Sequence, residues 1–145
     1  MYVPSTLALL VAAALQLATP VSANYEAGKA VQINFYSNSG CSAYTSETAA
    51  WWTRSPHAGE YVNGGSAGDC FSLGMPGASG SLNVANVWRG NGAKTGGSCD
   101  LYDGYNCGGV KGGIGFDKNS GSGGCVASRS SSGLLWKSAR CGAAP

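Results

Sequence analysis

Hydrophobic and polar residues alternate along several short segments of this chain, and residues that favour turns separate the segments. The clearest alternation is Ala-Val-Gln-Ile-Asn-Phe-Tyr at residues 30–36, which the turn-like sequence Ser-Asn-Ser-Gly follows. Such alternation of β-branched and aromatic residues with polar ones is typical of strands. We therefore predict an all-β fold in one layered domain, with strands at residues 30–36, 70–73, 81–88, 99–102, 125–127 and 134–136.

The sequence disfavours helix along almost the whole chain after residue 23. Only residues 45–52, which are rich in Ala and Thr, could form a helix, and a helix of that length is marginal on its own. All 24 glycines follow residue 23. Glycine is therefore nearly three times as frequent there as the roughly 7% usual in proteins, and it is a poor helix former.

The first 23 residues have the order of a secretory signal peptide. An apolar run at residues 7–18, interrupted only by Gln16, precedes Thr-Pro and the small-residue sequence Val-Ser-Ala that ends at Ala23. The run is shorter than the roughly 20 residues that span a bilayer, so no membrane anchor is expected. Cleavage after Ala23 leaves 122 of the 145 residues, 24–145, as a single domain that we expect to be secreted and extracellular.

The mature part contains six cysteines, and an even number in an exported chain predicts three disulfides among Cys41, Cys70, Cys99, Cys107, Cys125 and Cys141. Six cysteines allow fifteen connectivities. Zinc is the rival explanation, but the chain has no Cys-x-x-Cys pair and only one histidine. No metal and no cofactor are expected.

Charged residues are few and scattered. Nine basic and seven acidic side chains give a net charge of +2 without a basic stripe, so no nucleic-acid partner is expected. The C-terminus has no hydrophobic tail for a glycolipid anchor. We expect a monomer whose partner is an extracellular protein or carbohydrate.

The chain also shows an internal repeat. Residues 35–41 and 101–107 both place an apolar residue and a tyrosine before a cysteine. Residues 69–72 match 124–127, and residues 80–88 match 132–136 in the same order. These matches predict two four-stranded units, at about residues 30–98 and 99–141.

These residues resemble the Greek-key motif of the βγ-crystallin family, in which an aromatic strand runs into a turn and glycine and folds over a serine. Ser81 and Ser132 are placed like that serine. The resemblance implies two Greek-key units in a small disulfide-stapled β-sandwich, as in secreted killer-toxin-like members. Residues 76–81 and 130–132 lack the Asn/Asp pair of the calcium-binding members, so calcium binding is not implied. The chain is also similar to small secreted cysteine-rich effectors of filamentous fungi.

The Greek-key resemblance narrows the cysteine connectivity. In that arrangement the first and fourth strands of a unit lie side by side and antiparallel, which would join Cys99 to Cys141. Repeat equivalence would join Cys41 to Cys70 and Cys107 to Cys125, so that each unit has its own disulfide.

The candidate binding surface is Trp51, Trp52 and Arg54, because adjacent side chains in an extended segment point to opposite faces and Trp and Arg concentrate binding energy. In the alternative interpretation, one tryptophan fills the core and the other lies flat on the surface. Trp88 and Trp136, at matching repeat positions, are predicted to be core residues.

Catalysis has little support in the sequence. A His-Glu pair, His57 and Glu60, is the only candidate acid/base set, and His57 is expected to be an exposed loop residue. Three functions remain open, with no enzyme expected. They are a secreted effector or toxin-like protein that binds a host, competitor or cell-wall component, a structural wall-associated protein, and a small hydrolase or nuclease that uses His57 and Glu60.

Overall fold

The computed structural model describes residues 28–52, 61–64 and 68–143, and within them almost every regular element is a strand. The predicted signal peptide, Arg54, His57 and Glu60 lie outside these residues. The described part has no α-helix, so the all-β prediction is confirmed for it. Its elements are β1 (Lys29–Tyr36), β2 (Tyr44–Trp52), β3 (Tyr61–Gly64), β4 (Phe71–Ser72), β5 (Ser81–Val87), β6 (Gly97–Tyr102), the 3-10 helix η1 (Tyr105–Cys107), β7 (Lys111–Asp117), β8 (Ser122–Gly123), β9 (Val126–Ala127) and β10 (Ser138–Ala143).

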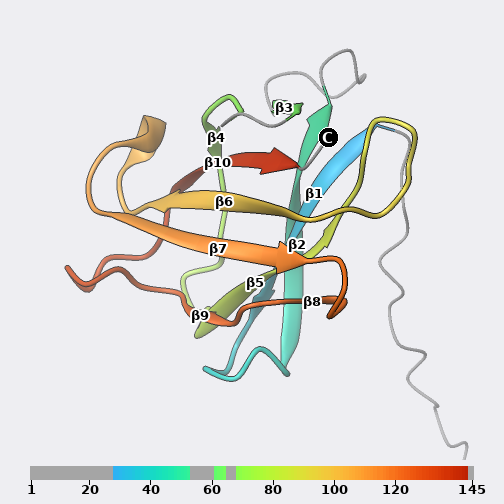
Figure 1. The fold of residues 1–145 in the computed structure, drawn as a ribbon. Helices are drawn as coiled ribbons and strands as arrows, with labels where there is room; N and C mark the ends of the chain where they lie inside the picture. The colour runs from blue at the N-terminus through green and yellow to red at the C-terminus, as the bar shows by residue number, and fades with distance from the viewer. Residues whose placement is uncertain (1–27, 53–60, 65–67, 144–145) are drawn as a thin grey trace, which may run out of the picture.

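The strands form two antiparallel sheets (Figure 1). The first has the order β2-β1-β5-β9. The second has the order β7-β6-β10-β4, and β8 extends it beyond β7. Strand β3 pairs in parallel with the ends of β2 and β10 and so connects the sheets at one edge.

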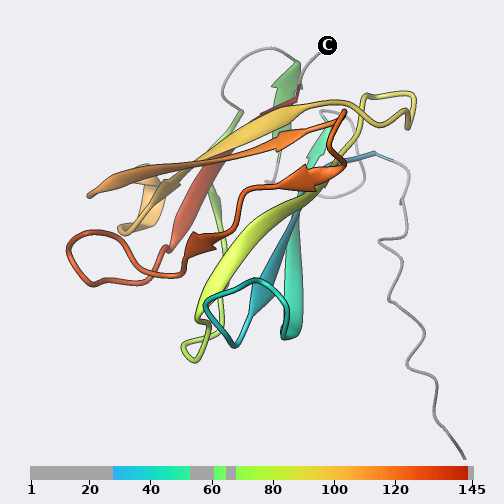
Figure 2. The ribbon, with the colours of Figure 1, turned by 60° about the horizontal axis from the view of Figure 1, so that its bottom comes forward.

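The two sheets repeat one pairing order with an exchange of their short strands. In each sheet a hairpin partner lies beside a first strand, the first strand beside a last strand, and the last strand beside a two-residue strand. The short strand β4 precedes β5 in the chain but pairs with β10, whereas β9 precedes β10 but pairs with β5 (Figures 1 and 2). Each half of the chain therefore contributes one short strand to the other half's sheet.

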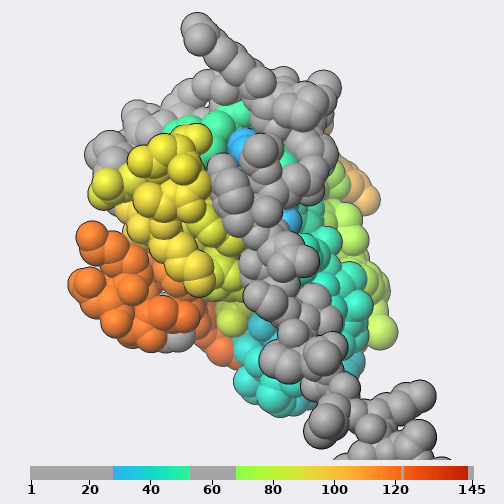
Figure 3. Space-filling model, turned by 90° about the vertical axis from the view of Figure 1, so that its right-hand side faces the viewer, coloured from blue at the N-terminus to red at the C-terminus, as the bar shows by residue number. Residues whose placement is uncertain are grey.

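Buried residues from both sheets form one hydrophobic core. The alternate apolar residues of β1 and β5 belong to it, as their hydrophobic pattern predicts, although β1 is buried along almost its whole length. The β7–β8 hairpin (orange in Figure 3) lies beside the β5–β6 connection (yellow) on one side of the molecule. The core contains Val31, Ile33, Phe35, Leu82, Val84, Leu101, Ile114, Phe116, Trp136 and Ala139.

The structure pairs Cys41 with Cys125, Cys70 with Cys107, and Cys99 with Cys141. The Cys99–Cys141 prediction is therefore confirmed, and this bond joins paired positions of β6 and β10. The predicted Cys41–Cys70 and Cys107–Cys125 bonds are wrong.

The strand exchange explains the error. Cys70 immediately precedes β4 and Cys125 immediately precedes β9, so the exchange takes each cysteine to the opposite sheet. The repeat equivalence of Cys41 with Cys107 and of Cys70 with Cys125 is kept, but both bonds cross between the two halves of the chain.

Several predicted strand positions also need correction. Residues 45–52, the one candidate for a helix, form most of β2. Residues 134–136 do not form a strand, although Leu135 makes an isolated bridge with Arg129, and the last strand begins at Ser138. The glycine-rich β7 was not predicted at all.

Candidate functional site: a surface on two fixed loops

Two serines hold the hairpin turns of the two sheets in the same way. The Oγ of Ser81 accepts the Cys41 N–H at 3.1 Å and donates to the Asn38 carbonyl at 2.5 Å. The Oγ of Ser138 accepts the Cys107 N–H at 2.9 Å and donates to the Gly104 carbonyl at 2.6 Å.

The cysteines of the two turns match as well. Both have positive φ, 52° for Cys41 and 56° for Cys107, which is uncommon for residues other than glycine. Ser138 is therefore the counterpart of Ser81, and the assignment of that place to Ser132 is wrong. Because Trp88 follows β5 whereas Trp136 precedes β10, these two are not equivalent either, although both are buried as predicted.

Ser132 instead helps to connect two loops through Asp103. The Asp103 side chain is 4% exposed, and its Oδ2 accepts hydrogen bonds from Ser130 and Ser132, each at 2.6 Å. Its Oδ1 accepts the Val110 N–H at 2.7 Å. The hydrogen bonds from Ser130 and Ser132 hold the pKa of Asp103 below its usual value. The Asp103 carboxylate thus connects the loop at residues 103–110 to the loop at residues 128–135.

These two loops present most of the large apolar side chains that remain exposed in the described part of the chain. Tyr105 is 68% exposed, Leu134 51% and Val110 37%, and only Tyr44, at 43%, lies elsewhere. Both loops project from the same end of the molecule, at the left of Figures 1 and 2. We call Tyr105, Val110 and Leu134, with the pocket described next, the loop-end surface.

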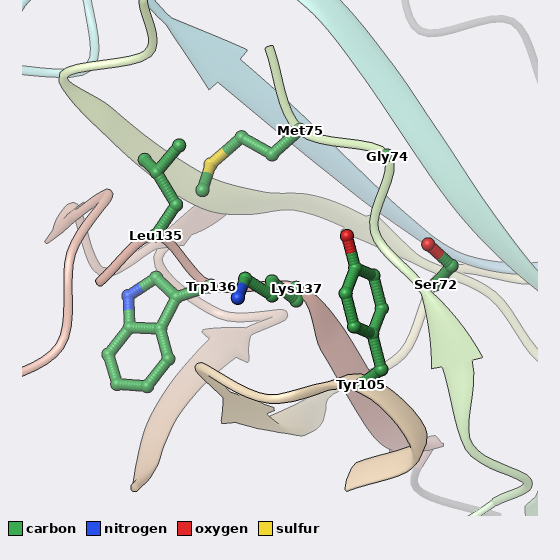
Figure 4. Close-up of a pocket in the computed structure, with 7 residues that line it drawn as sticks. All are labelled: Ser72, Gly74, Met75, Tyr105, Leu135, Trp136 and Lys137. Atoms are coloured by element: carbon green, nitrogen blue, oxygen red, sulfur yellow. The ribbon is translucent and has the colours of Figure 1, made fainter. Parts of the chain in front are cut away.

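A partly open pocket lies beside Tyr105 (Figure 4). Its volume is about 180 Å³, and it is lined by Ser72, Gly74, Met75, Tyr105, Leu135, Trp136 and Lys137. Met75 and Leu135 point toward one another on one side, and the Tyr105 ring stands on the other. The Trp136 indole points away from these side chains, and its Nε1–H donates to the Ala127 carbonyl at 2.9 Å. The space is smaller than the roughly 300–1,000 Å³ of drug-sized ligand sites and suits one projecting group.

Lys137 supplies the positive charge of this pocket. Its Nζ lies 5.2 Å from the centroid of the Tyr105 ring, a cation–π distance. The ion pairs among the described residues join Lys29 to Glu47 and Lys111 to Asp100, and neither involves Lys137. The Asp103 carboxylate accepts three hydrogen bonds, and the charge of Lys137 also helps to lower the pKa of Asp103.

The tryptophan pair predicted as a binding surface is largely buried. Trp51 is 6% exposed, and its ring lies 5.8 Å from the Nζ of Lys29. Trp52 is partly buried against the core, and its Nε1–H donates to the Trp88 carbonyl at 3.0 Å. The two rings point to opposite faces of β2, as expected for neighbours in a strand. Neither ring is a large exposed group, and the third member of the predicted surface, Arg54, lies outside the described residues.

The sequence did not predict the loop-end surface, because the parts of this surface lie far apart in the chain. A signal was available in Tyr105, a lone aromatic residue in the glycine-containing sequence Asp103–Cys107. Among the described residues, no group of three or more His, Cys, Asp or Glu side chains could hold a metal, and no helix is long and apolar enough to cross a membrane.

No family model, no curated protein and no solved structure matches this chain. The functional assignment therefore depends on the residues themselves.

Proposed function

We propose that this chain is a secreted protein that acts by binding an extracellular partner through the loop-end surface. The observation that carries the proposal is the concentration of exposed Tyr105, Val110 and Leu134 on two neighbouring loops. Exposed apolar side chains that gather in one place mark interaction sites, whereas single ones need no explanation. Binding residues are often carried by loops that a rigid scaffold holds in place, and these three side chains lie on such loops.

The way the loops are held supports the same proposal. The loop at residues 103–110 is fixed by the Cys70–Cys107 disulfide, by Ser138 and by Asp103. Loops that are ordered before binding lose less conformational entropy when the partner arrives. The charged and apolar groups of this surface are thus presented in a fixed geometry.

We also propose that the two sheets are Greek-key units of the βγ-crystallin type, packed as a sandwich, with the short strands β4 and β9 exchanged between them. This is supported by the antiparallel pairing of first and last strands, β1 with β5 and β6 with β10. The equivalent bonds of Ser81 and Ser138 to their hairpin turns agree with it. An origin in filamentous fungi and an effector role follow from the resemblance alone.

A protein partner is favoured over a carbohydrate. Met75, Leu135 and Tyr105 line the pocket beside the polar Ser72 and Lys137, and their apolar side chains suit an apolar group better than a sugar with its many hydroxyl groups. The hydrolase alternative depends on His57 and Glu60, which lie outside the described residues.

The binding test compares the oxidised mature protein with the double variant Tyr105→Ala, Leu134→Ser. Tyr44→Ala is the matched control, because Tyr44 is 43% exposed but lies on β2. Fluorescently labelled proteins are titrated onto plant tissue, competing microbial cells and isolated walls, before and after protease treatment of those surfaces. We expect saturable, protease-sensitive binding that weakens at least tenfold in the double variant and is unchanged in the control. Equal binding by all three proteins, or no saturable binding to any of these surfaces, would overturn the proposal.

Secretion is tested separately by expressing residues 1–145 in a secreting host. The medium should contain a protein whose N-terminal residue is Asn24. Retention of the protein inside the cell with Met1 still present would contradict the predicted secretion and cleavage.

A further inference from the structure

We propose that the pocket beside Tyr105 binds the C-terminal residue of a partner polypeptide, with an apolar side chain in the pocket and the carboxylate on Lys137. This inference rests on the proposed function, since it names the part of the partner that the loop-end surface recognises.

The size and walls of the pocket indicate the apolar part of the ligand. A volume of about 180 Å³ between Met75, Leu135 and Tyr105 has room for one side chain but not for a drug-sized ligand. Anchor side chains that fill such pockets contribute much of the binding energy of protein interfaces.

The positive charge of Lys137 indicates the second part of the ligand, a negatively charged group. Lys137 is half-buried and holds its ammonium over the Tyr105 ring without an ion pair to any described acidic residue. The Asp103 carboxylate accepts hydrogen bonds from Ser130, Ser132 and Val110, and the charge of Lys137 also helps to lower the pKa of Asp103, but the two side chains are not within ion-pair distance. An ammonium at the edge of an apolar pocket complements a carboxylate, and hydrogen bonds between such charged groups are stronger than neutral ones.

An apolar pocket beside an ammonium group favours a polypeptide C-terminus over other acidic groups. An Asp or Glu side chain carries its carboxylate on a short chain with no separate apolar group, whereas a C-terminal Leu carries both within one residue. Terminal carboxylates are a recurrent element of peptide recognition. The exposed Tyr105, Val110 and Leu134 would contact the preceding part of the same partner.

The test uses the ¹⁵N-labelled, oxidised mature protein and three probes. They are the peptide acetyl-Gly-Gly-Leu with a free carboxylate, the same peptide with a C-terminal amide, and 4-methylpentanoate as a free apolar acid. Titrations are followed by chemical-shift changes at Met75, Tyr105 and Lys137.

We expect the acid peptide to shift these three residues and to bind at least tenfold more tightly than the amide. This preference should fall to less than about threefold in Lys137→Met and be retained in Lys137→Arg. Lys111→Met, which removes an exposed lysine that pairs with Asp100, is the matched control and should keep the preference.

Equal binding of the acid and amide peptides, or shifts confined to other parts of the protein, would overturn the inference. Binding of 4-methylpentanoate as tight as that of the peptide would overturn the assignment to a polypeptide and make the pocket a site for small acids. Loss of partner binding in the Tyr105→Ala, Leu134→Ser variant without any acid preference would leave the proposed function standing and refute only this inference. Acid preference without an effect of that variant on partner binding would refute the proposed function instead.

Discussion

Replacing Ser138 with alanine removes the hydroxyl that holds the turn of the second hairpin. Ser138 is 1% exposed, and its Oγ bonds to the Cys107 N–H and the Gly104 carbonyl. The truncation leaves one donor and one acceptor without these partners. A buried polar group that loses its partner costs about 1–3 kcal/mol, so we expect the free energy of unfolding to fall by about 2 kcal/mol.

Differential scanning calorimetry of the oxidised mature protein measures this loss, which for a domain of this size corresponds to a fall in Tm of roughly 6–12 °C. Ser81→Ala should produce a similar fall, because Ser81 is fully buried and makes the equivalent bonds. Ser131→Ala, at an exposed loop position, is the control and should change stability by less than about 0.5 kcal/mol. A Tm of Ser138→Ala equal to that of the control would refute the structural role of this serine.

Two further predictions concern the surroundings of the loop-end surface. Gly112→Ala would place a Cβ atom 2.7 Å from Cη2 of Trp136, whereas Gly113→Ala would meet no atom within 4 Å. Urea titration should show a loss of about 1–3 kcal/mol for the first variant and little change for the second, and equal midpoints would contradict this packing. Because its hydrogen bonds lower the pKa of Asp103, they should persist above the ordinary value of 3.8 and be lost as the pH falls through the lower folded-state value. The hydrogen-exchange protection of the Val110 amide should therefore drop only below pH 3.8 and be low at all pH values in Asp103→Ala; strong protection in that variant would contradict the connection.

The strands that could be predicted from the sequence are those whose own residues alternate. In β1 and β5, the alternate apolar residues Val31, Ile33, Phe35, Leu82 and Val84 all belong to the core, as the local pattern predicts, although β1 is buried along almost its whole length. In β7, three of the seven residues are glycines, which locally indicate turns. Its conformation is decided by hydrogen bonds to β6 and by the Trp136 ring, which occupies the space beside Gly112.

The exchange of short strands could not be predicted from the sequence, because β4 and β9 have two residues each. A segment of that length does not encode which last strand it pairs with. The pairing is decided by long-range packing, and the cysteines that precede these strands follow it. The repeat therefore identified which cysteines are equivalent but not which ones bond.

In the candidate site, too, the local sequence could be interpreted, but the contacts set by long-range packing could not be predicted. Trp51 and Trp52 were expected to form a surface because neighbouring rings in a strand point to opposite faces, but Trp51 is buried and Trp52 packs partly against the core. Tyr105 and Lys137 are 32 positions apart in the sequence and meet only because β6 and β10 pair. Their cation–π contact is a product of tertiary structure.

Disulfide mapping tests the central claim most directly, since the strand exchange positions both the core and the loop-end surface. Proteolysis of the unreduced mature protein followed by mass spectrometry should identify Cys41–Cys125, Cys70–Cys107 and Cys99–Cys141. The first two bonds cross between the halves of the chain, and their detection would support the exchange. Peptides that contain Cys41–Cys70 and Cys107–Cys125 bonds would contradict it.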